Sequence, residues 1–356
     1  MEYSRQMQSK ATCDNRDVLA IRLHGPGDIR LDEVAPPTPD ATTVIIQVEA
    51  CGVCGSDVHF ADGSARTGHV PITLGHEVAG TIVAAPEEKY PPGTPVVAEV
   101  GRFCGACPRC LEGRPNLCER AQVLGIHVDG GFADLVAVPL ESVVIRPPEV
   151  PVAAAATAAD AGATALHAIE RRARITKGET VLIIGAGGLG TYGIQWARLA
   201  GAGAVIVADT NPRALEEASA LGVDETLLVE QGTSVGRRVK LLSDGGVDAA
   251  IEFVGTAAAV DAAVKSIRPG GRAVTVGVGM EPVVSLPVVL WSNHEYALMG
   301  SYGSLPGDTQ RVLEALSAGT VVSPRTVDVP LADGPALLES LVAGPASSPG
   351  RPIIRP

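Results

Sequence analysis

Hydrophobic positions fall in short, separate runs over the first part of the chain. Runs rich in Val, Ile and Ala occupy residues 44–48, 78–84, 96–100 and 133–138, with Pro and Gly frequent between them. Such runs between turn residues are typical of strands in a β-rich, barrel-like domain. A stretch rich in alanine follows at 151–170, and alanine favours helix. We therefore expect a β-rich first domain that ends in a helical hinge.

Strand and helix patterns alternate from Thr180 onward. The predicted strands are 181–187, 204–209, 249–255 and 272–279, the predicted helices are 191–201, 211–222 and 256–267, and a turn is predicted at 268–271. This alternation predicts an α/β domain with a parallel, doubly wound sheet.

The last part of the chain, from Ser301, contains a helical pattern at 309–319 and a strand-like ending at 351–356. We expect this part to return to the first domain. The predicted boundaries are 1–161 for the first domain, 162–301 for the second and 302–356 for the returning segment.

The composition describes a large acidic chain. Its 356 residues exceed what one hydrophobic core usually organises, which agrees with two domains. The formal net charge of −12 would repel phosphate backbones, so we expect no nucleic-acid partner. No uninterrupted apolar stretch reaches the roughly 18 residues needed to cross a bilayer, and the first twenty residues lack the apolar core of a secretory signal. We expect a soluble, cytoplasmic protein with no membrane partner.

Residues Gly185 to Gly190 form a G-x-G-x-x-G pattern that follows an apolar strand and opens a helix. The first glycine permits a tight turn, Gly187 lets the backbone approach a pyrophosphate, and Gly190 lets the helix pack on the strand. Asp209 ends the next strand, where a carboxylate accepts hydrogen bonds from the adenosine ribose. This arrangement predicts a site for NAD rather than NADP, since a 2′-phosphate would meet Asp209 as a like charge. The alternative is that the glycines form only a turn and Asp209 only caps a helix.

Six of the seven cysteines lie between positions 51 and 118, a clustering that indicates metal binding rather than a disulfide framework. Cys104, Cys107, Cys110 and Cys118 are spaced C-x2-C-x2-C-x7-C on one short loop. Four thiolates can enclose a tetrahedral zinc ion with no open position, so that zinc would be structural. An iron–sulfur cluster is the alternative for four thiolates. The seventh cysteine, Cys13, stands apart, and we expect no role for it.

A second group of candidate ligands begins in CGVCGSDVH at Cys54 and continues in GHE with His76 and Glu77. A thiolate, an imidazole and a carboxylate suit a catalytic zinc, which keeps one position open for water or substrate. One alternative is that Cys54 and His76 are ordinary core residues. Another is a redox pair of Cys51 and Cys54, which is disfavoured because no βαβ unit follows it.

CGVCGSDVH, GHEVAG, the four-cysteine loop, DGGFADLV and GAGGLG follow one another in an order that resembles the zinc-containing medium-chain dehydrogenase/reductase family. The resemblance covers nearly the whole chain from Val18 onward. It implies a GroES-like catalytic domain, a Rossmann coenzyme domain and an active site between them. It also implies one catalytic and one structural zinc ion per chain, NAD(H) as coenzyme, and a homodimer or homotetramer joined through the Rossmann domains.

The resemblance assigns the catalytic zinc to Cys54 and His76. Glu77 matches a glutamate that binds the metal directly in some members and lies behind it in others. The third ligand is normally a Cys or Glu at the start of the interdomain helix, where this chain has Asp160. Aspartate is a reasonable zinc ligand, but the departure leaves the reach of the ligand and the shape of the pocket open.

The resemblance also implies roles around the metal and the coenzyme. Ser56 matches a hydroxyl that hydrogen-bonds the substrate alkoxide, His59 a base that passes the proton to solvent, and Asp57 a carboxylate that orients the ligand histidine. For His59 the alternative is a solvated surface side chain, as it is for Arg351, which matches an arginine at the coenzyme pyrophosphate. The expected coenzyme contacts are Gly185, Gly187, Gly188, Leu189, Gly190, Asp209, Arg213 and Arg351. The remaining histidines, expected to be structural, are His24, His69, His127, His167 and His294.

These implications predict the reversible oxidation of a small secondary alcohol to a ketone. LHGPGDIRLDE, CGSDVH and Glu99 resemble the polyol and threonine dehydrogenase branch, which favours a polyol, cyclitol or amino alcohol. The sequence around Asp160 favours a simple secondary alcohol or ketone as the alternative. A zinc-free quinone or enoyl reductase is disfavoured, because it needs none of these metal ligands. A non-catalytic NAD-binding protein is the alternative from another class.

Overall fold

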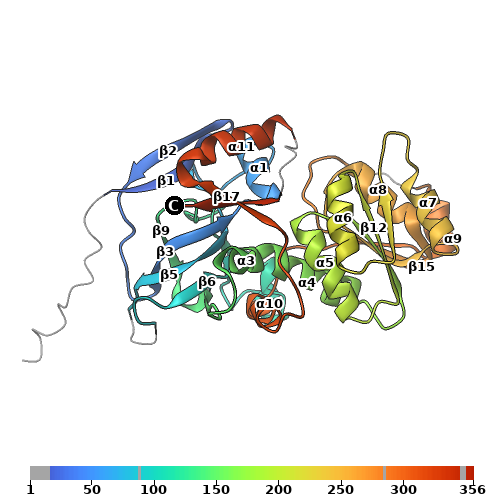
Figure 1. The fold of residues 1–356 in the computed structure, drawn as a ribbon, viewed down its shortest axis with the longest axis horizontal. Helices are drawn as coiled ribbons and strands as arrows, with labels where there is room; N and C mark the ends of the chain where they lie inside the picture. The colour runs from blue at the N-terminus through green and yellow to red at the C-terminus, as the bar shows by residue number, and fades with distance from the viewer. Residues whose placement is uncertain (1–16, 87–89, 284–285, 345–349) are drawn as a thin grey trace, which may run out of the picture.

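A computed structural model describes residues 17–86, 90–283, 286–344 and 350–356. Figure 1 shows two lobes, joined by the green segment that contains helices α3 and α4. The blue strands from the start of the chain and the red strands from its end lie in one lobe, while the yellow and orange elements form the other. Cys13 lies outside the described residues.

The first lobe is built on a mainly antiparallel sheet with the strand order β10-β6-β5-β3-β18-β17, in which β9 also pairs with β3. Its strands are β3 (Thr43–Gly52), β5 (Glu77–Ala84), β6 (Pro95–Ala98), β9 (Leu135–Pro139), β10 (Val143–Ile145), β17 (Thr326–Pro330) and β18 (Arg351–Arg355). The runs predicted at 44–48, 78–84, 96–100 and 133–138 fall in β3, β5, β6 and β9. Strand β18 lies antiparallel to β3, so the end of the chain completes the sheet of the first lobe.

Smaller elements surround this sheet. A three-stranded sheet contains β1 (Val18–Gly25), β2 (Asp28–Val34) and β4 (Ile72–Thr73), and a two-stranded one contains β7 (Gly101–Arg102) and β8 (Gln122–Val123). The helices of this lobe are α1 (Gly55–Ala61), α2 (Pro108–Leu111) and α11 (Gly334–Ala343), with short 3-10 turns at Pro115–Leu117, Leu140–Ser142 and Leu331–Asp333.

The second lobe is a six-stranded parallel sheet with the order β13-β12-β11-β14-β15-β16. Its strands are β11 (Thr180–Ile184), β12 (Ala204–Asp209), β13 (Glu225–Leu228), β14 (Val247–Glu252), β15 (Ile267–Thr275) and β16 (Ala297–Gly300). Its helices are α5 (Gly188–Leu199), α6 (Pro212–Ala220), α7 (Val235–Leu242), α8 (Ala257–Ser266) and α9 (Val288–His294). The strand order reverses between β11 and β14, as it does in a doubly wound Rossmann sheet, so this fold prediction is confirmed.

The turn predicted at 268–271 is found inside strand β15 instead. The pairing of β15 with β14 shifts register there, from Val247 opposite Ile267 to Ala249 opposite Arg272. Gly270 has a φ of +75°, a conformation that residues with a side chain adopt rarely. The RPGG segment therefore interrupts the pairing: its glycines turn the chain locally, and the pairing with β14 resumes at Arg272.

The alanine-rich stretch forms one long helical segment, Val152–Ala173, between the lobes. It consists of α3 (Val152–Thr157), a π-helical turn (Ala158–Gly162), α4 (Ala163–His167) and a second π-helical turn (Ala168–Ala173). This segment is long and apolar enough to cross a membrane. However, 89% of an apolar 18-residue stretch within it is buried inside the protein, as in a core helix. The helix was predicted, whereas the two π-helical turns were not.

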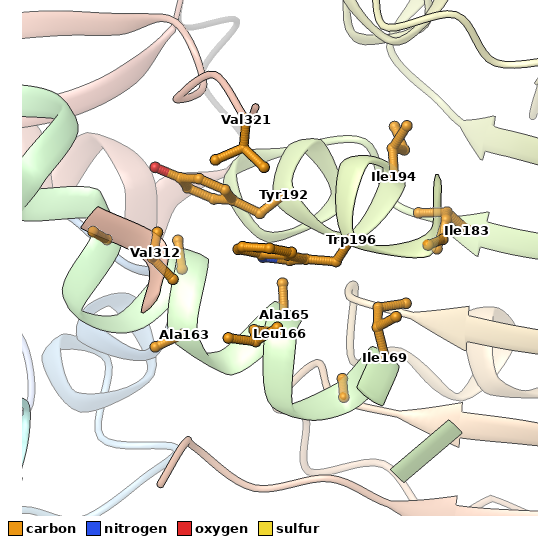
Figure 2. Close-up of a cluster of buried hydrophobic side chains, with 14 of the residues drawn as sticks. Ala163, Ala165, Leu166, Ile169, Ile183, Tyr192, Ile194, Trp196, Val312 and Val321 are labelled. Carbon is orange, nitrogen blue, oxygen red and sulfur yellow. The ribbon is translucent and has the colours of Figure 1, made fainter. Parts of the chain in front are cut away.

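Small residues on the linking helix let large side chains of the second lobe pack closely against it. Figure 2 shows the indole of Trp196 lying over Ala165 and Leu166, with the ring of Tyr192 beside it. Tyr192 and Trp196 belong to α5 and are buried. Val312, from α10 (Asp308–Ser317), lies in the same cluster. Helix α5, which begins in the glycine-rich loop, is thus packed on the helix that carries Asp160.

Candidate active site and metal centres

Three potential metal ligands from distant parts of the chain meet beside the linking helix. Cys54 is the N-cap of α1, His76 directly precedes β5, and Asp160 lies in the first π-helical turn. The Oδ2 atom of Asp160 is 3.5 Å from the Cys54 sulfur and 3.5 Å from Nε2 of His76. All three ligand atoms lie within 4.8 Å of one another.

These separations fit a tetrahedral zinc ion. Bonds of about 2.0–2.3 Å place neighbouring ligand atoms about 3.3–3.6 Å apart around such a centre. His76 is buried, whereas Cys54 and Asp160 are partly exposed. A zinc ion held by these three side chains would therefore keep its fourth position on the accessible side, which is the arrangement of a catalytic site.

Two further side chains orient the ligands. Asp57 is completely buried; its Oδ2 atom accepts the backbone N–H of Cys54 at 2.8 Å, and its Oδ1 atom lies 3.5 Å from Nδ1 of His76. The Thr164 hydroxyl donates to Oδ1 of Asp160 at 2.7 Å, which leaves Oδ2 directed toward the other ligands. Burial alone would raise the pKa of Asp160, but the hydrogen bond and charge of His76 outweigh it and lower this pKa to about 2. Asp160 is therefore a carboxylate, the form that binds metal.

Glu77 lies behind this cluster rather than within it. Its Oε1 atom accepts the backbone N–H of Ala161 at 3.0 Å and a hydrogen bond from Arg351 at 2.7 Å. Burial raises the pKa of Glu77 to about 7, although the charge of Arg351 opposes this shift. Arg351 also lies against the glycine-rich loop, because a Cβ atom on Gly188 would come within 2.1 Å of its Nη1 atom. Arg351 is 9% exposed, so it is not a solvated surface side chain.

His59 bridges the two lobes at the edge of the site. Its Nε2 atom lies 3.0 Å from the carbonyl oxygen of Val278, and its Nδ1 atom lies 2.9 Å from the hydroxyl of Ser64. A carbonyl oxygen only accepts hydrogen bonds, so Nε2 carries the proton and Nδ1 accepts the hydrogen bond of the Ser64 hydroxyl. Ser56 lines the same pocket, but within the described chain it forms no hydrogen bond to His59.

The four cysteines of the loop form a compact cluster. The Cys104 sulfur lies 3.4 Å from that of Cys118 and 3.9 Å from that of Cys110, and the Cys107 sulfur lies 3.6 Å from that of Cys110. Tetrahedral zinc–thiolate bonds of about 2.3 Å give sulfur separations of about 3.8 Å. Backbone N–H groups of Ala106 and Cys107 lower the pKa of Cys104 to about 6. The cluster fits a metal ion enclosed by four thiolates.

The glycine-rich loop has the backbone geometry that its pattern predicts. Gly185 has a φ of +88°, and a Cβ atom on Gly190 would lie 1.9 Å from the carbonyl oxygen of Gly185. Asp209 accepts the backbone N–H of Ala186 at 2.6 Å and that of Asn211 at 2.7 Å. The N-cap of α6 is Asn211, so Asp209 is not the helix cap. Gly187 is the N-cap of α5, and Arg213 is exposed on α6.

A pocket of about 450 Å³ joins these parts. Its lining includes the ligands Cys54, His76 and Asp160 from one side and Leu189 and Val278 from the other. A volume in this range suits a small molecule. The pocket therefore brings the candidate metal site and the coenzyme loop to one cavity.

Sequence reasoning missed several residues that shape this site. The Trp196 indole N–H donates to the carbonyl oxygen of Gly162, within the π-helical turn that carries Asp160. The Asn116 side chain, from the cysteine loop, donates to the Tyr302 carbonyl oxygen at 2.8 Å, and both residues line the pocket. None of these contacts has a signal in sequence spacing, because each joins segments that only the tertiary fold brings together.

Known proteins resemble this chain over nearly its whole length. Residues 40–148 match the alcohol dehydrogenase GroES-like domain, and residues 188–318 match the zinc-binding dehydrogenase domain. Sorbitol dehydrogenase of Bacillus subtilis (strain 168) is 30% identical over 81% of this chain and 82% of its own length. L-threonine 3-dehydrogenase of Saccharopolyspora erythraea is 34% identical over 71% of this chain and 74% of its own.

A solved structure shows the same fold. A zinc-binding dehydrogenase of Sinorhizobium meliloti 1021, bound to NADP, superimposes with a TM-score of 0.86 at 30% identity, over 96% of this chain and 99% of that one. The matched domains, the relatives and the two metal-binding clusters agree with one another. The chain therefore belongs to the zinc-containing medium-chain dehydrogenase/reductase family and is an oxidoreductase of the alcohol dehydrogenase type.

Proposed function

We propose that this enzyme oxidises a secondary alcohol to a ketone, reversibly, with NAD⁺ as the hydride acceptor. The observation that carries the proposal is the shared pocket: Cys54, His76 and Asp160 face the same cavity as Leu189 of the glycine-rich loop. A Lewis acid held by these ligands and a hydride acceptor bound at this loop would face one small-molecule space, which supports the proposal.

The residues of the site have three roles: they hold the metal, bind the coenzyme and move the proton. When bound, zinc lowers the pKa of the alcohol hydroxyl, and NAD⁺ supplies the acceptor for the hydride. Cys54, His76 and Asp160 would hold the metal, with Asp57 and Thr164 orienting the last two. We assign Ser56 to receiving the hydroxyl proton and His59 to passing it toward solvent, since both side chains line the pocket. Glu77 and Arg351 hold the linking helix against the glycine-rich loop.

We assign the coenzyme preference to NAD because of Asp209. Its carboxylate ends β12 beside the glycine-rich loop and would repel a 2′-phosphate. A similar structure is bound to NADP, so membership of the family does not decide between NAD and NADP, and the assignment rests on Asp209. We expect kcat/KM for NAD⁺ to exceed that for NADP⁺, and Asp209→Ala to narrow the difference. A preference for NADP⁺ in the wild-type enzyme would overturn the assignment.

The substrate class rests on the relatives. Enzymes named for sorbitol and L-threonine match most of the chain, which supports a polyhydroxylated or amino-substituted secondary alcohol. A simple secondary alcohol is the alternative within enzymes. We also propose a cytoplasmic location and a homodimer or homotetramer. The oligomer is supported by β16, whose outer edge has no partner strand among the described residues, and by the exposed Val288, Val289 and Leu298 on α9 and β16.

The decisive experiment measures bound zinc and NAD⁺ reduction together. Wild type and Cys54→Ser would be compared on polyols, cyclitols, threonine and simple secondary alcohols. We expect about two zinc ions per wild-type chain, and in the variant about one, with turnover lowered by about a thousandfold or more. Turnover that does not depend on Cys54 would overturn the mechanism. Two retained zinc ions with no activity on any alcohol would favour the non-catalytic alternative.

A further inference from the structure

The rim of the substrate pocket contains a cation without a counter-ion. Arg66 lies in the loop after α1, lines the pocket and is exposed. Among the described residues, it forms no ion pair and no hydrogen bond. Arg351, behind the metal site, is by contrast paired with Glu77. An arginine that is left unpaired at the edge of a binding pocket is available to a ligand.

Among the charged side chains that line the pocket, Arg66 is the one whose charge is not balanced by a neighbour in the described lining. Asp160 is the one carboxylate among the described lining residues. With zinc bound, the thiolate of Cys54 and the carboxylate of Asp160 would neutralise the two positive charges of the metal. The remaining formal charge is that of Arg66, in a chain whose net charge is −12. The side chains that line the pocket would then carry one formal positive charge, at the rim, which favours an anionic over a cationic group there.

A second donor lies on the same rim. His127 is exposed and lines the pocket, and its Nδ1 atom accepts the backbone N–H of Val123 at 3.1 Å. The ring proton is therefore on Nε2, which is a hydrogen-bond donor. The loops that carry the two side chains are joined, because the backbone N–H of Gly68 donates to the Ile126 carbonyl oxygen at 2.6 Å. Arg66 and His127 therefore belong to one connected edge of the pocket.

We propose that this rim, formed by Arg66 and His127, binds an anionic group of the substrate, a carboxylate or a phosphate, at the end of the molecule away from the reacting carbon. The metal ligand His76 is buried, whereas the rim is exposed, so the hydroxyl would enter first and the anion would remain at the opening. The inference rests on the proposed function and narrows its substrate class. A guanidinium with a nearby N–H donor suits a carboxylate or phosphate, while a substrate ammonium would find no free carboxylate in the described lining.

Paired substrates test this inference. Wild type, Arg66→Gln and Arg66→Lys would be assayed on a six-carbon sugar alcohol, on the sugar acid of the same configuration and on its phosphorylated analogue. We expect wild type to prefer an anionic substrate, and Arg66→Gln to raise KM for it about tenfold with kcat little changed. KM for the neutral alcohol should not change, and Arg66→Lys should restore part of the loss. The preferred anion, carboxylate or phosphate, identifies the ligand group.

The control is Arg237→Gln, which removes the same charge from an exposed position on α7, outside this pocket. It should leave both KM values unchanged, whereas a general effect of net charge would move them in both variants. Equal KM for acids and neutral alcohols in wild type, or an equal response of both to Arg66→Gln, would overturn the inference while the alcohol dehydrogenase activity stood. Absence of NAD⁺ reduction with every substrate would instead count against the proposed function.

Discussion

The two metal centres of this enzyme differ in how much of the fold each one needs. The four cysteines of the first lie on one loop, and their sulfurs meet within 3.4–3.9 Å. The ligands of the second come from α1, from the residue before β5 and from the linking helix, and two of them are 106 positions apart. One centre is local, whereas the other depends on how the linking helix packs against the first lobe.

This difference has a physical consequence. A local centre forms whenever its loop closes, so its metal stabilises that loop directly. In the assembled centre, any change that shifts the linking helix moves Asp160 relative to Cys54 and His76. The local centre should therefore respond to loss of a ligand, and the assembled centre also to changes in packing at a distance from the metal.

Loss of a thiolate from the local centre should give the largest effect. Cys107 is buried, and its sulfur lies 3.6 Å from that of Cys110. In Cys107→Ser we expect the zinc content to fall by one and the free energy of unfolding to fall by about 4–5 kcal/mol, because metal binding free energy contributes to folding. Zinc analysis and chemical denaturation would measure this. Cys51→Ser, at a buried cysteine outside both clusters, should keep both zinc ions; an unchanged stability in Cys107→Ser would contradict a structural role.

Acid should weaken the packing on which the assembled centre depends. Burial, followed by the charge of Arg171, lowers the pKa of His167 in α4 to about 4. The unfolded chain, with a pKa of about 6.5, binds this proton more readily, so stability is complete above pH 6.5 and declines toward pH 4. We expect this group to account for about 3 kcal/mol of that loss.

Denaturation curves from pH 7 to pH 4 would test the role of His167. In His167→Gln the decline with falling pH should be shallower than in wild type by about that amount. His69→Gln, at an exposed histidine, should leave the slope unchanged. Parallel pH profiles for wild type and His167→Gln would show that the proton is not excluded from this site.

The contrast between the centres also explains what could be predicted from sequence. The cysteine spacing is local, so it indicates a four-thiolate cluster without knowledge of the fold. Four strands and three helices of the second lobe were predicted from hydrophobic periodicity, which local sequence contains as well, whereas β13, β16, α7 and α9 were not predicted. Cys54 and His76 could be proposed as ligands from their residue types, but Asp160 joined them only through family resemblance, because no spacing rule links positions so far apart.

Other features could not be predicted because they arise from tertiary contacts. The π-helical turn at Ala158–Gly162 has the composition of an ordinary helix. The unpaired state of Arg66 at the rim depends on which side chains surround it, and His127 was expected to be structural. The segment 268–271 contains strong turn residues and interrupts the pairing with β14, yet it lies within the bounds of one strand, Ile267–Thr275. In each case residues that are distant in sequence but close in the fold decide the structure, and local sequence does not contain them.

A change in packing should weaken the assembled centre while sparing the local one. The Trp196 N–H donates to the Gly162 carbonyl oxygen at 3.2 Å and so holds the π-helical turn of Asp160. In Trp196→Phe we expect the affinity for the catalytic zinc to fall about tenfold, as changes behind metal ligands often do. Competition with a chelator would measure both zinc ions. The control is Tyr192→Phe, which removes a hydroxyl bonded to Thr157 from the same helix and cluster; equal zinc loss in both variants would indicate general loosening instead.

The smallest expected effect is on KM, from a change in the cysteine loop at a residue that also lines the pocket. Asn116 belongs to the cysteine loop, and its side chain donates to the carbonyl oxygen of Tyr302 at 2.8 Å. Both residues line the pocket, so the cysteine loop contributes directly to its wall. In Asn116→Ala we expect KM for the substrate to rise about threefold, with kcat and the content of both zinc ions unchanged, since one hydrogen bond contributes about 1 kcal/mol. Arg109→Ala, on the exposed side of the same loop, should leave KM unchanged. If Asn116→Ala lowers stability but not substrate affinity, the loop serves the fold alone, and the two centres act independently.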